Sequence, residues 1–401
     1  MIQKKQRKDL IWNFIDNHID LIYFILVTLF AITVRILLMK YNSGDYDMFL
    51  KPWFDTLKNY GGLPGLANDI GNYTPIYMTI LAILTYIPID SLITIKVVSI
   101  IFDFIGALTI KKIVLELLCD NKHKNKIALL IYSVCLFLPT IILNSSYWAQ
   151  SDQIYTTFVL ISLLFLIKKK YKLAILWWAV AFAFKFQAIF IFPLYVLMYI
   201  ANRKIKIKDF LIIPITIFVL SIPKVIYSQD LLAGFKVYYN QANTYQEYIT
   251  LNFPNVYSIF LKGYDLNNPN LINTPFKEMG TIGIIIMLVI LITLAYFVRI
   301  KKINFDKHAI IEFSLFSVLM TTFLLPQMHE RYLFMGDVIS LLYLVINKKQ
   351  YYVPIIIEMI SLNGYMYLLF AGFAINISIL SIVFLILLIL YTRNIIKKYL
   401  Y

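Results

Sequence analysis

Four short polar motifs lie beside apolar stretches of the chain and could carry chemistry. SGDYDMF has Asp45 and Asp47 just after an apolar run, and YWAQSD has Asp152 just before another. The cations Lys185 and Arg331 stand in FKFQ and MHERY. A positioned carboxylate can serve as a general base, and cations can stabilise a developing phosphate charge. Together these residue types suit chemistry on a lipid with a charged headgroup.

Further polar residues complete this set. Charged groups in or near the hydrocarbon are costly, so each one is a functional candidate by default. The further candidates are Gln150 of YWAQSD, Gln187 of FKFQ, His329 and Glu330 of MHERY, and Lys96 and Asp103 of an apolar segment. We expect these residues to lie near one leaflet, and their convergence indicates a site more strongly than any single residue does.

Each candidate also has a purely structural interpretation. Asp45 or Asp47 can cap the helix that follows, since Asp is a favoured N-cap, and Asp152 can cap the span after it. Lys185 can snorkel toward the headgroups. The other structural interpretations are an ion pair between Lys96 and Asp103, a helix end at His329 and Arg331, and an interfacial belt for Trp and Tyr.

The composition defines the class of protein that must position these residues. The 401 residues are 60% hydrophobic and only 15% charged, and the mean hydropathy is +0.75. Apolar stretches of membrane-spanning length recur from end to end, which indicates a polytopic helical membrane protein. The cysteines, Cys119 and Cys135, give no sign of a disulfide framework or a metal site.

The positive charge orients the protein in the membrane. The net charge is +15, but most Lys and Arg residues fall in short loops on the side that the positive-inside rule makes cytoplasmic. This placement argues against binding of nucleic acid and favours contact with anionic membrane lipids. The basic N-terminus has no small-residue cleavage site after its apolar run, so we interpret that run as an uncleaved first span.

The apolar runs and basic loops predict about twelve spans in the cell membrane, with both termini cytoplasmic. The segments 173–184 and 187–201 are short, so we expect partial spans that meet inside the membrane at KFQ. The expected spans are 19–40, 93–118, 126–144, 152–168, 173–184, 187–201, 209–227, 279–299, 309–326, 332–347, 351–369 and 374–392.

Two long segments should face the outside, at 41–92 and 228–278. In the first, 48–60 places Phe and Trp residues on one helical stripe, and Pro52 marks where that helix starts or kinks. We interpret the apolar run 74–90 as a helix in the outer leaflet, because a full span there would place the next basic loop outside. The second segment is rich in Tyr and Asn.

In their order along the chain, the motifs resemble the GT-C superfamily of membrane glycosyltransferases, which use polyprenyl-phosphate sugars. The likeness is greatest to bacterial and archaeal relatives of the GPI mannosyltransferase II family. It rests on SGDYDMFLKPWFDTL, GNYTPIY, KVVSIIFDF, YWAQSDQIYTTF, FAFKFQAIFIFPL, LNFPNVY and LPQMHERYLF, which cover roughly residues 40–340 in order. The chain departs from the family pattern at Ala149, where Gly is expected, and in FKFQ, where Lys-Pro-Gln is commoner.

This resemblance implies an all-α polytopic GT-C fold with interfacial helices in the first outer loop. It implies a membrane module over 1–230 that contains a catalytic first outer loop at 41–92. An outer aromatic-rich loop at 228–278 and a C-terminal transmembrane module over 279–401, which carries the HERY motif, would follow.

The resemblance also implies an inverting transfer of a hexose, mannose by family habit, to an acceptor hydroxyl on the outer face. The base falls on Asp45, with Asp47 as the second candidate. Arg331, His329 and Lys185 would bind the phosphate of the polyprenyl-phosphate sugar. The residues expected to bind substrate are Asp152, Gln150, Trp148, Gln187, Tyr73 and Glu330.

Several partners and alternatives remain open. A glycan, a glycolipid or a cell-wall polymer can each supply the acceptor hydroxyl. Polyprenyl phosphate is already a good leaving group, so we expect neither a metal nor a cofactor, and the lipid-linked sugar is the donor substrate. About twelve spans with intramembrane charges also suit a transporter or flippase of lipid-linked saccharides. A non-catalytic lipid-binding or assembly subunit is a third reading, in which Asp45 is dispensable.

Overall fold

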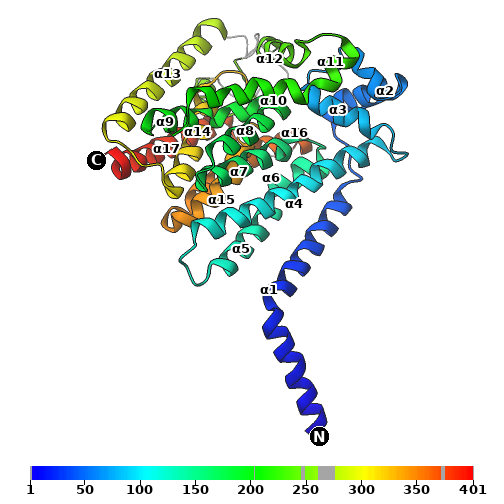
Figure 1. Cartoon of the computed structure of the whole chain (residues 1–401), viewed down its shortest axis with the longest axis vertical. Helices are drawn as coiled ribbons and strands as arrows, with labels where there is room; N and C mark the ends of the chain where they lie inside the picture. The colour runs from blue at the N-terminus through cyan, green and yellow to red at the C-terminus, as the bar shows by residue number, and fades with distance from the viewer. Residues whose placement is uncertain (1, 203, 245–248, 261–275, 372–374, 401) are drawn as a thin grey trace.

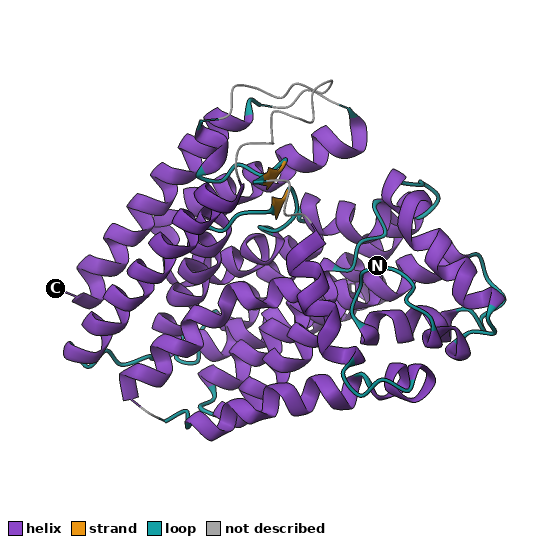
Figure 2. Ribbon diagram, turned by 90° about the horizontal axis from the view of Figure 1, so that it is seen from above, coloured by secondary structure: helices purple, strands orange, loops and turns teal. Residues whose placement is uncertain are grey.

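A computed structural model describes residues 2–202, 204–244, 249–260, 276–371 and 375–400. These residues are mostly helical, and Figure 1 shows the helices packed side by side in one body from which the long first helix extends. Two short strands interrupt the helices within these described residues (Figure 2). The hydrocarbon core offers backbone groups no water, so helices, which satisfy their own hydrogen bonds, are the expected answer to this composition.

The elements up to residue 202 contain the first five motifs of the resemblance, including YWAQSD and FKFQ. They are α1 (Ile2–Leu38), the π-helical turn η1 (Tyr46–Leu50), α2 (Lys51–Asn59), the 3-10 turn η2 (Leu63–Ala67), α3 (Pro75–Leu84), α4 (Ser91–Leu117), α5 (Lys124–Leu136), α6 (Pro139–Ile142), η3 (Leu143–Tyr147), α7 (Asp152–Ile167), α8 (Tyr171–Phe184), η4 (Phe186–Ile191) and α9 (Phe192–Asn202).

The elements after residue 203 contain the second outer segment and MHERY. They are η5 (Ile207–Leu211), α10 (Ile212–Leu220), α11 (Ile222–Ser228), α12 (Ala233–Thr244), β1 (Thr250–Leu251), η6 (Tyr257–Ile259), α13 (Phe276–Ile300), α14 (Lys307–Leu324), β2 (Met328–His329), α15 (Phe334–Ile346), η8 (Lys348–Gln350), α16 (Tyr352–Phe370), α17 (Ile377–Ile395) and η9 (Ile396–Leu400).

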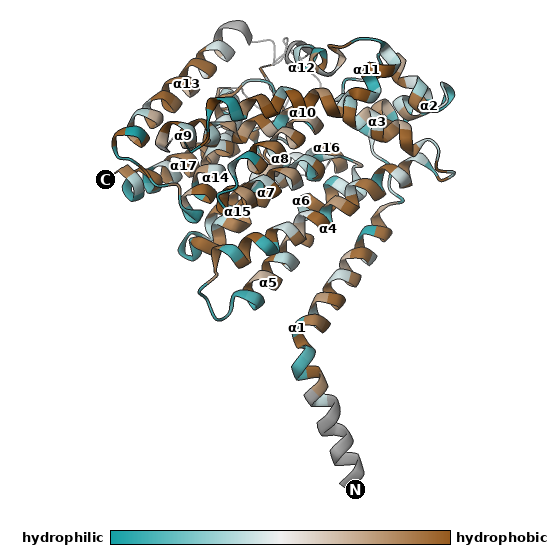
Figure 3. Cartoon of the chain, viewed as in Figure 1, coloured by the Kyte–Doolittle hydropathy of each residue, from teal (hydrophilic) through white to brown (hydrophobic). Residues whose placement is uncertain are grey.

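The lengths of the helices define a multi-pass membrane protein. Within the described residues, six helices are long and apolar enough to cross a membrane, and two bent pairs bring the number to eight if each pair is one span. The bends of 50° and 51° fall beside Pro139 and Pro223, where proline removes a helical hydrogen bond. Figure 3 shows apolar colour running along most of these helices.

The expected count of twelve spans remains a prediction. Four of the twelve fall on shorter apolar helices, namely α7, α8, the pair η4–α9, and α15. A helix of 16 residues such as α7 is about 24 Å long, less than the ~30 Å of the hydrocarbon core. The helix α3, which lies in the apolar run 74–90, has only 10 residues and is too short to cross, as expected.

The chain breaks at FKFQ as the sequence predicts. The helix α8 ends at Phe184, Lys185 is extended with φ −154° and ψ 132°, and η4 begins at Phe186. An extended residue between two helices turns its side chain out of both helical faces. The break therefore frees Lys185 to reach a partner on another helix.

The long helix α4 separates two polar regions of the protein. It has 27 residues, or about 40 Å. Near its end, Glu116 Oε1 pairs with Lys168 Nζ at 2.9 Å, and the carbonyl of Glu116 accepts a hydrogen bond from Lys307 Nζ at 3.2 Å. Near its start, Lys96 Nζ donates to the carbonyl of Met39 at 3.1 Å. Lys168 and Lys307 of two basic loops thus lie at the end of α4 opposite to Tyr41, where the first outer segment begins.

The two outer segments contain more regular structure than the sequence indicates. In the first, α2 carries Pro52 in its first turn and buries Phe54 and Leu57, whereas Phe49 of the expected stripe is 42% exposed. In the second, α12 is followed by β1, which pairs in parallel with β2 in the register Thr250 to Met328. The rest of the second segment, 245–248 and 261–275, lies outside the described residues.

Candidate active site

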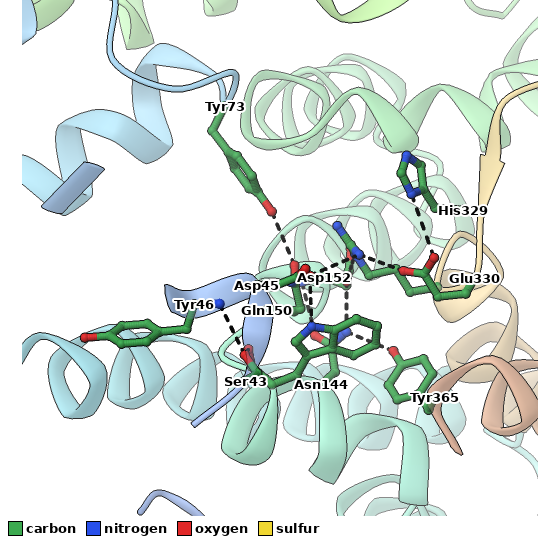
Figure 4. A network of polar contacts seen from close by, with 12 residues as sticks. Ser43, Asp45, Tyr46, Tyr73, Asn144, Gln150, Asp152, His329, Glu330 and Tyr365 are labelled. Atoms are coloured by element: carbon green, nitrogen blue, oxygen red, sulfur yellow. Dashed lines mark hydrogen bonds and ion pairs between the residues drawn. The ribbon is translucent and has the colours of Figure 1, made fainter. Parts of the chain in front are cut away.

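Asp45 lies where α1 gives way to η1, with its carboxylate aimed at the YWAQSD segment (Figure 4). Its Oδ2 accepts hydrogen bonds from Trp148 Nε1 and from Gln150 Nε2, each at 2.9 Å. Its side chain is 28% exposed. Within the described residues, Oδ1 of Asp45 makes no hydrogen bond. One oxygen is therefore anchored and the other is open to a ligand.

The Asp45 side chain does not cap the helix that follows. Asp45 occupies the N-cap position of η1, but its side chain makes no capping hydrogen bond. The backbone amide of Tyr46 is instead bound by Ser43 Oγ at 3.3 Å, and Ser43 Oγ also donates to the carbonyl of Trp148 at 3.0 Å. Ser43 thus connects the start of η1 to the YWAQSD segment. The carboxylate of Asp45 is not needed to cap η1.

The WAQ turn presents its two donors through a left-handed residue. Ala149 has φ +63°, a region that costs a non-glycine residue roughly 1–2 kcal/mol. The turn is closed by a hydrogen bond from the amide of Gln150 to the carbonyl of Asn144 at 2.8 Å. This conformation explains in physical terms why a glycine suits the position at which the chain departs from the family pattern.

Asp152 is buried and contacts side chains from three other parts of the chain. Its Oδ1 pairs with Lys185 Nζ at 2.6 Å, and its Oδ2 accepts from Asn144 Nδ2 at 2.8 Å. Arg331 Nε lies 3.5 Å from the same Oδ2. Ser151 is the N-cap of α7, and Asp152 makes none of its contacts with that helix's own amides. Asp152 therefore acts as a junction for charged groups and not as a helix cap.

The MHERY segment places Arg331 close to both Asp45 and Asp152. Arg331 Nη1 lies 2.8 Å from Glu330 Oε1 and 3.7 Å from Asp45 Oδ2. The guanidinium carbon lies 5.3 Å from the ring centroid of Trp148, a cation–π distance. Within the described residues, Nη2 of Arg331 makes no hydrogen bond or ion pair. A planar fork with one open edge can receive a phosphate.

The neighbours of Glu330 keep it ionised. Burial by itself raises the pKa of Glu330, but the hydrogen bond from His329 and the charge of Arg331 lower that pKa to about 2. His329 Nδ1 lies 3.8 Å from Glu330 Oε2. The β1–β2 pair holds this segment, since the amide of Gln327 donates to the carbonyl of Ile249 at 2.8 Å. The second outer segment thus positions the cation of MHERY.

Tyr73 joins the site from the first outer segment. Its hydroxyl donates to Gln150 Oε1 at 3.3 Å, and Lys185 Nζ lies 5.5 Å from its ring centroid. Trp53 and Tyr77 pack against the Tyr73 ring at centroid distances of 5.3 and 4.8 Å. These contacts consequently fix the position of the Tyr73 ring beside Gln150, which donates a hydrogen bond to Asp45.

Two predicted site residues stand outside this cluster. Asp47 is exposed, and both its oxygens accept from Asn42 Nδ2 at 2.8 Å. Gln187 is buried in η4, and its Oε1 has no hydrogen-bond partner within the described residues. The geometry thus distinguishes Asp45 from Asp47, which the sequence leaves as alternatives.

The expected ion pair between Lys96 and Asp103 is wrong. Seven residues along a helix separate two groups by about 10 Å, so other partners are nearer. Asp103 Oδ2 instead pairs with Arg35 Nε at 2.7 Å, and both side chains are fully buried. Lys96 Nζ donates to the carbonyls of Met39 and Tyr41. This network fastens α1 to α4 and lies beside the site without joining it.

Sequence reasoning missed several residues that hold the site together. Arg35 had a signal, because an arginine inside the first apolar run is costly unless it is paired. Asn144 and Tyr365 had none: Asn144 Nδ2 donates to Tyr365 Oη at 2.9 Å across more than two hundred residues of sequence. The Tyr365 ring also packs edge-on against Trp148 at 5.0 Å. α16 therefore supports the WAQ turn through the contacts of Tyr365 with Asn144 and Trp148.

A metal ligand set is not apparent at this site. Within the described residues, no group of three or more His, Cys, Asp or Glu residues could hold a metal ion. The acids of the site are instead bound to cations and to amide or indole donors. That the reaction needs neither metal nor cofactor remains a prediction.

The fold and its long apolar helices define a polytopic, mostly helical membrane protein. No protein-family model matches the sequence, and no curated protein shows significant similarity to it. Any more particular assignment therefore depends on the chemistry of the site itself.

Proposed function

We propose that this protein is an inverting glycosyltransferase of the GT-C type. It would transfer a hexose, mannose by family habit, from a polyprenyl-phosphate sugar to an acceptor hydroxyl on the outer face of the cell membrane. The observation that carries the proposal is the placement of Asp45, which has one oxygen anchored by Trp148 and Gln150 while Arg331 lies 3.7 Å away. A base beside a phosphate-binding cation is what such a transfer requires.

Asp45 would act as the base through its open oxygen. The acceptor hydroxyl gives its proton to Oδ1 of Asp45 as its oxygen attacks the anomeric carbon of the donor sugar. The bond from that carbon to the phosphate oxygen breaks on the opposite face, and polyprenyl phosphate leaves with the bonding electrons. The two donors on Oδ2 hold the carboxylate in orientation during this proton transfer.

Arg331 would receive the phosphate of the donor. Its Nη1 and Nε are oriented by Glu330 and Asp152, and its Nη2 is open within the described residues. Lys185 and His329 can add positive charge at the same place, although Lys185 is already paired with Asp152 at 2.6 Å. The acids therefore hold the cations in position, and the donor phosphate shares the cations with them.

The proposal is tested by transfer from a radiolabelled polyprenyl-phosphate hexose to a panel of acceptors. Asp45→Asn should abolish transfer and leave donor binding within a few-fold of the wild type. Asp47→Asn is the matched control and should retain transfer, because Asp47 hydrogen-bonds to Asn42 and to no other side chain among the described residues. Full activity in Asp45→Asn contradicts the assignment of the base.

The flippase alternative predicts a different result from the same preparation. A flippase would move a fluorescent lipid-linked saccharide across a vesicle membrane without forming a glycosidic bond. Movement without any transfer product, whichever acceptor is supplied, would replace the glycosyltransferase proposal by the transporter one.

A further inference from the structure

A cavity of about 420 Å³ lies between the first outer segment and the second, next to the Asp45 site. One wall is the chain from η2 to the start of α3, and the other is formed by α11 and α12. Its volume falls within the range of about 300–1,000 Å³ that is typical of small-molecule sites.

Polar contacts from Lys224 and Gln241 connect the two walls and maintain the shape of the cavity. Lys224 Nζ of α11 donates to the carbonyl of Asn68 at 2.8 Å and pairs with Asp69 Oδ1 at 3.0 Å. Gln241 Nε2 of α12 donates to the carbonyl of Asn72 at 2.5 Å. The cavity is therefore a formed space between tethered segments, which is the usual condition of a small-molecule site.

The charges that line the cavity are matched. Lys224 pairs with Asp69, and Lys236 Nζ pairs with Asp230 Oδ2 at 2.6 Å. Two cations and two acids leave no net charge, so an anionic ligand would have to displace an acid to gain a cation. A neutral ligand meets no such cost.

The rest of the lining suits a ligand rich in hydroxyl groups. The remaining polar lining consists of amide and hydroxyl side chains, which can both donate and accept hydrogen bonds, and the apolar lining is aliphatic. These residues are Asn68, Asn72, Asn240, Gln241, Ser228 and Tyr73 for the polar part, with Met78 and Val237 among the apolar part. Sugars present both hydroxyls and apolar C–H faces to such a surface.

Tyr73 connects the cavity to the proposed base. It lines the cavity, and its hydroxyl donates to Gln150, which in turn donates to Asp45. In Figure 4 the Tyr73 side chain points from the first outer segment down to Gln150 and Asp45. Tyr73 thus joins the lining of the cavity to the hydrogen bonds that hold Asp45.

We propose that this cavity binds the acceptor, and that the acceptor end is an uncharged saccharide. This inference rests on the proposed glycosyltransferase function and names the class of its acceptor. The paired charges exclude a preference for phosphodiester or uronate chains, and the fixed ring of Tyr73 directs one hydroxyl of the saccharide to Asp45.

Binding is measured separately from transfer, with the full chain in lipid nanodiscs. The neutral probes are trisaccharides in the manno, gluco and galacto configurations. The anionic probes are a trigalacturonate and a glycerol-phosphate trimer. The binding of each probe is measured by saturation-transfer NMR. At least one neutral trisaccharide should bind to the wild type ten-fold more tightly than both anionic probes. Tighter binding of an anionic probe, or no neutral binding at tens of millimolar, overturns the inference.

Matched variants locate the binding. Val237→Trp fills the cavity and should weaken neutral binding at least ten-fold, whereas Ile226→Trp adds the same ring on α11 at a side chain that is 64% exposed and outside the cavity. Asn240→Ala removes an amide without adding volume and should weaken binding several-fold. It provides the test of the cavity if the tryptophan variant does not fold. Unchanged binding in both cavity variants overturns the inference.

The two proposals fail in different ways. Neutral saccharide binding that the cavity variants abolish, together with no transfer from any lipid-linked hexose, supports the cavity and removes the transferase. Transfer that Val237→Trp and Asn240→Ala leave at the wild-type rate supports the transferase and removes the cavity as its acceptor site.

Discussion

Lys185 Nζ lies 2.6 Å from Asp152 Oδ1, and both side chains are buried. The break after α8 turns the lysine out of its helix, and the start of α7 holds the acid that receives it. This pair joins two of the polar motifs that the sequence presents separately. It also leaves the second oxygen of Asp152 to Asn144 and Arg331.

Removing one member of the Lys185–Asp152 pair should destabilise the protein strongly. Lys185→Met leaves a buried carboxylate without its closest cation, and the loss is expected to be about 3–5 kcal/mol, as for other broken buried pairs. The double variant Lys185→Met/Asp152→Leu should recover part of that loss, since no uncompensated charge remains. Thermal unfolding in detergent measures both variants. Lys51→Met, whose pair with Asp55 is about half exposed, is the control and should leave the melting temperature almost unchanged, because exposed ion pairs contribute little to stability.

Arg331→Lys should impair the reaction although it keeps the charge. A lysine cannot hold Glu330, approach Asp152 and offer an open edge at once, because it lacks the planar fork. We expect kcat/KM for the lipid-linked donor to fall roughly 10–100-fold, which corresponds to about 1.4–2.7 kcal/mol. Steady-state kinetics with varied donor concentration test this. Wild-type kinetics in Arg331→Lys would remove this residue from the phosphate site.

Glu330 should contribute stability that is constant near neutral pH and disappears in acid. Its pKa is lowered to about 2 from the usual 4.5, so the folded protein binds the proton less readily than the unfolded chain. The contribution is therefore fully present above pH 4.5 and is lost as the pH falls from 4.5 through 2. The stability difference between wild type and Glu330→Gln should stay level from pH 5 to 8 and shrink below pH 4.5. A difference that instead shrinks as the pH rises from 5 to 8 has the wrong sign for this ion pair.

Ala149→Gly should stabilise the protein. Ala149 has φ +63°, where glycine avoids a cost of roughly 1–2 kcal/mol but loses about 0.5–1 kcal/mol through the greater freedom of its unfolded chain. The net gain is about 0.5–1 kcal/mol and should appear as a small rise in melting temperature. Ala179→Gly in the buried interior of α8 is the control and should lower stability by about 1 kcal/mol. Equal losses in both variants would contradict the strain at Ala149.

The sequence predicted local features well where the signal is local. Hydropathy indicated a helical multi-pass protein, and long apolar helices confirm that class. The polar residues of FKFQ marked the break at Lys185. The basic loop that follows the run 74–90 argued against a full span there, and the structure has only the 10-residue helix α3 in that run. The number of spans and the side of the membrane on which the site lies stay predictions, because helix length alone does not define either.

Only the tertiary structure decided which side chains meet. The sequence paired Asp103 with Lys96 on one helix, but the packing of α1 against α4 supplies Arg35. It favoured Asp45 as the base and kept Asp47 as a second candidate, and of the two only Asp45 contacts the WAQ turn, which lies more than a hundred residues away. Composition and periodicity indicate which parts of each segment are exposed to lipid and which to water. They carry no information on which distant helix will lie beside it, and the geometry of a buried charge depends on that neighbour.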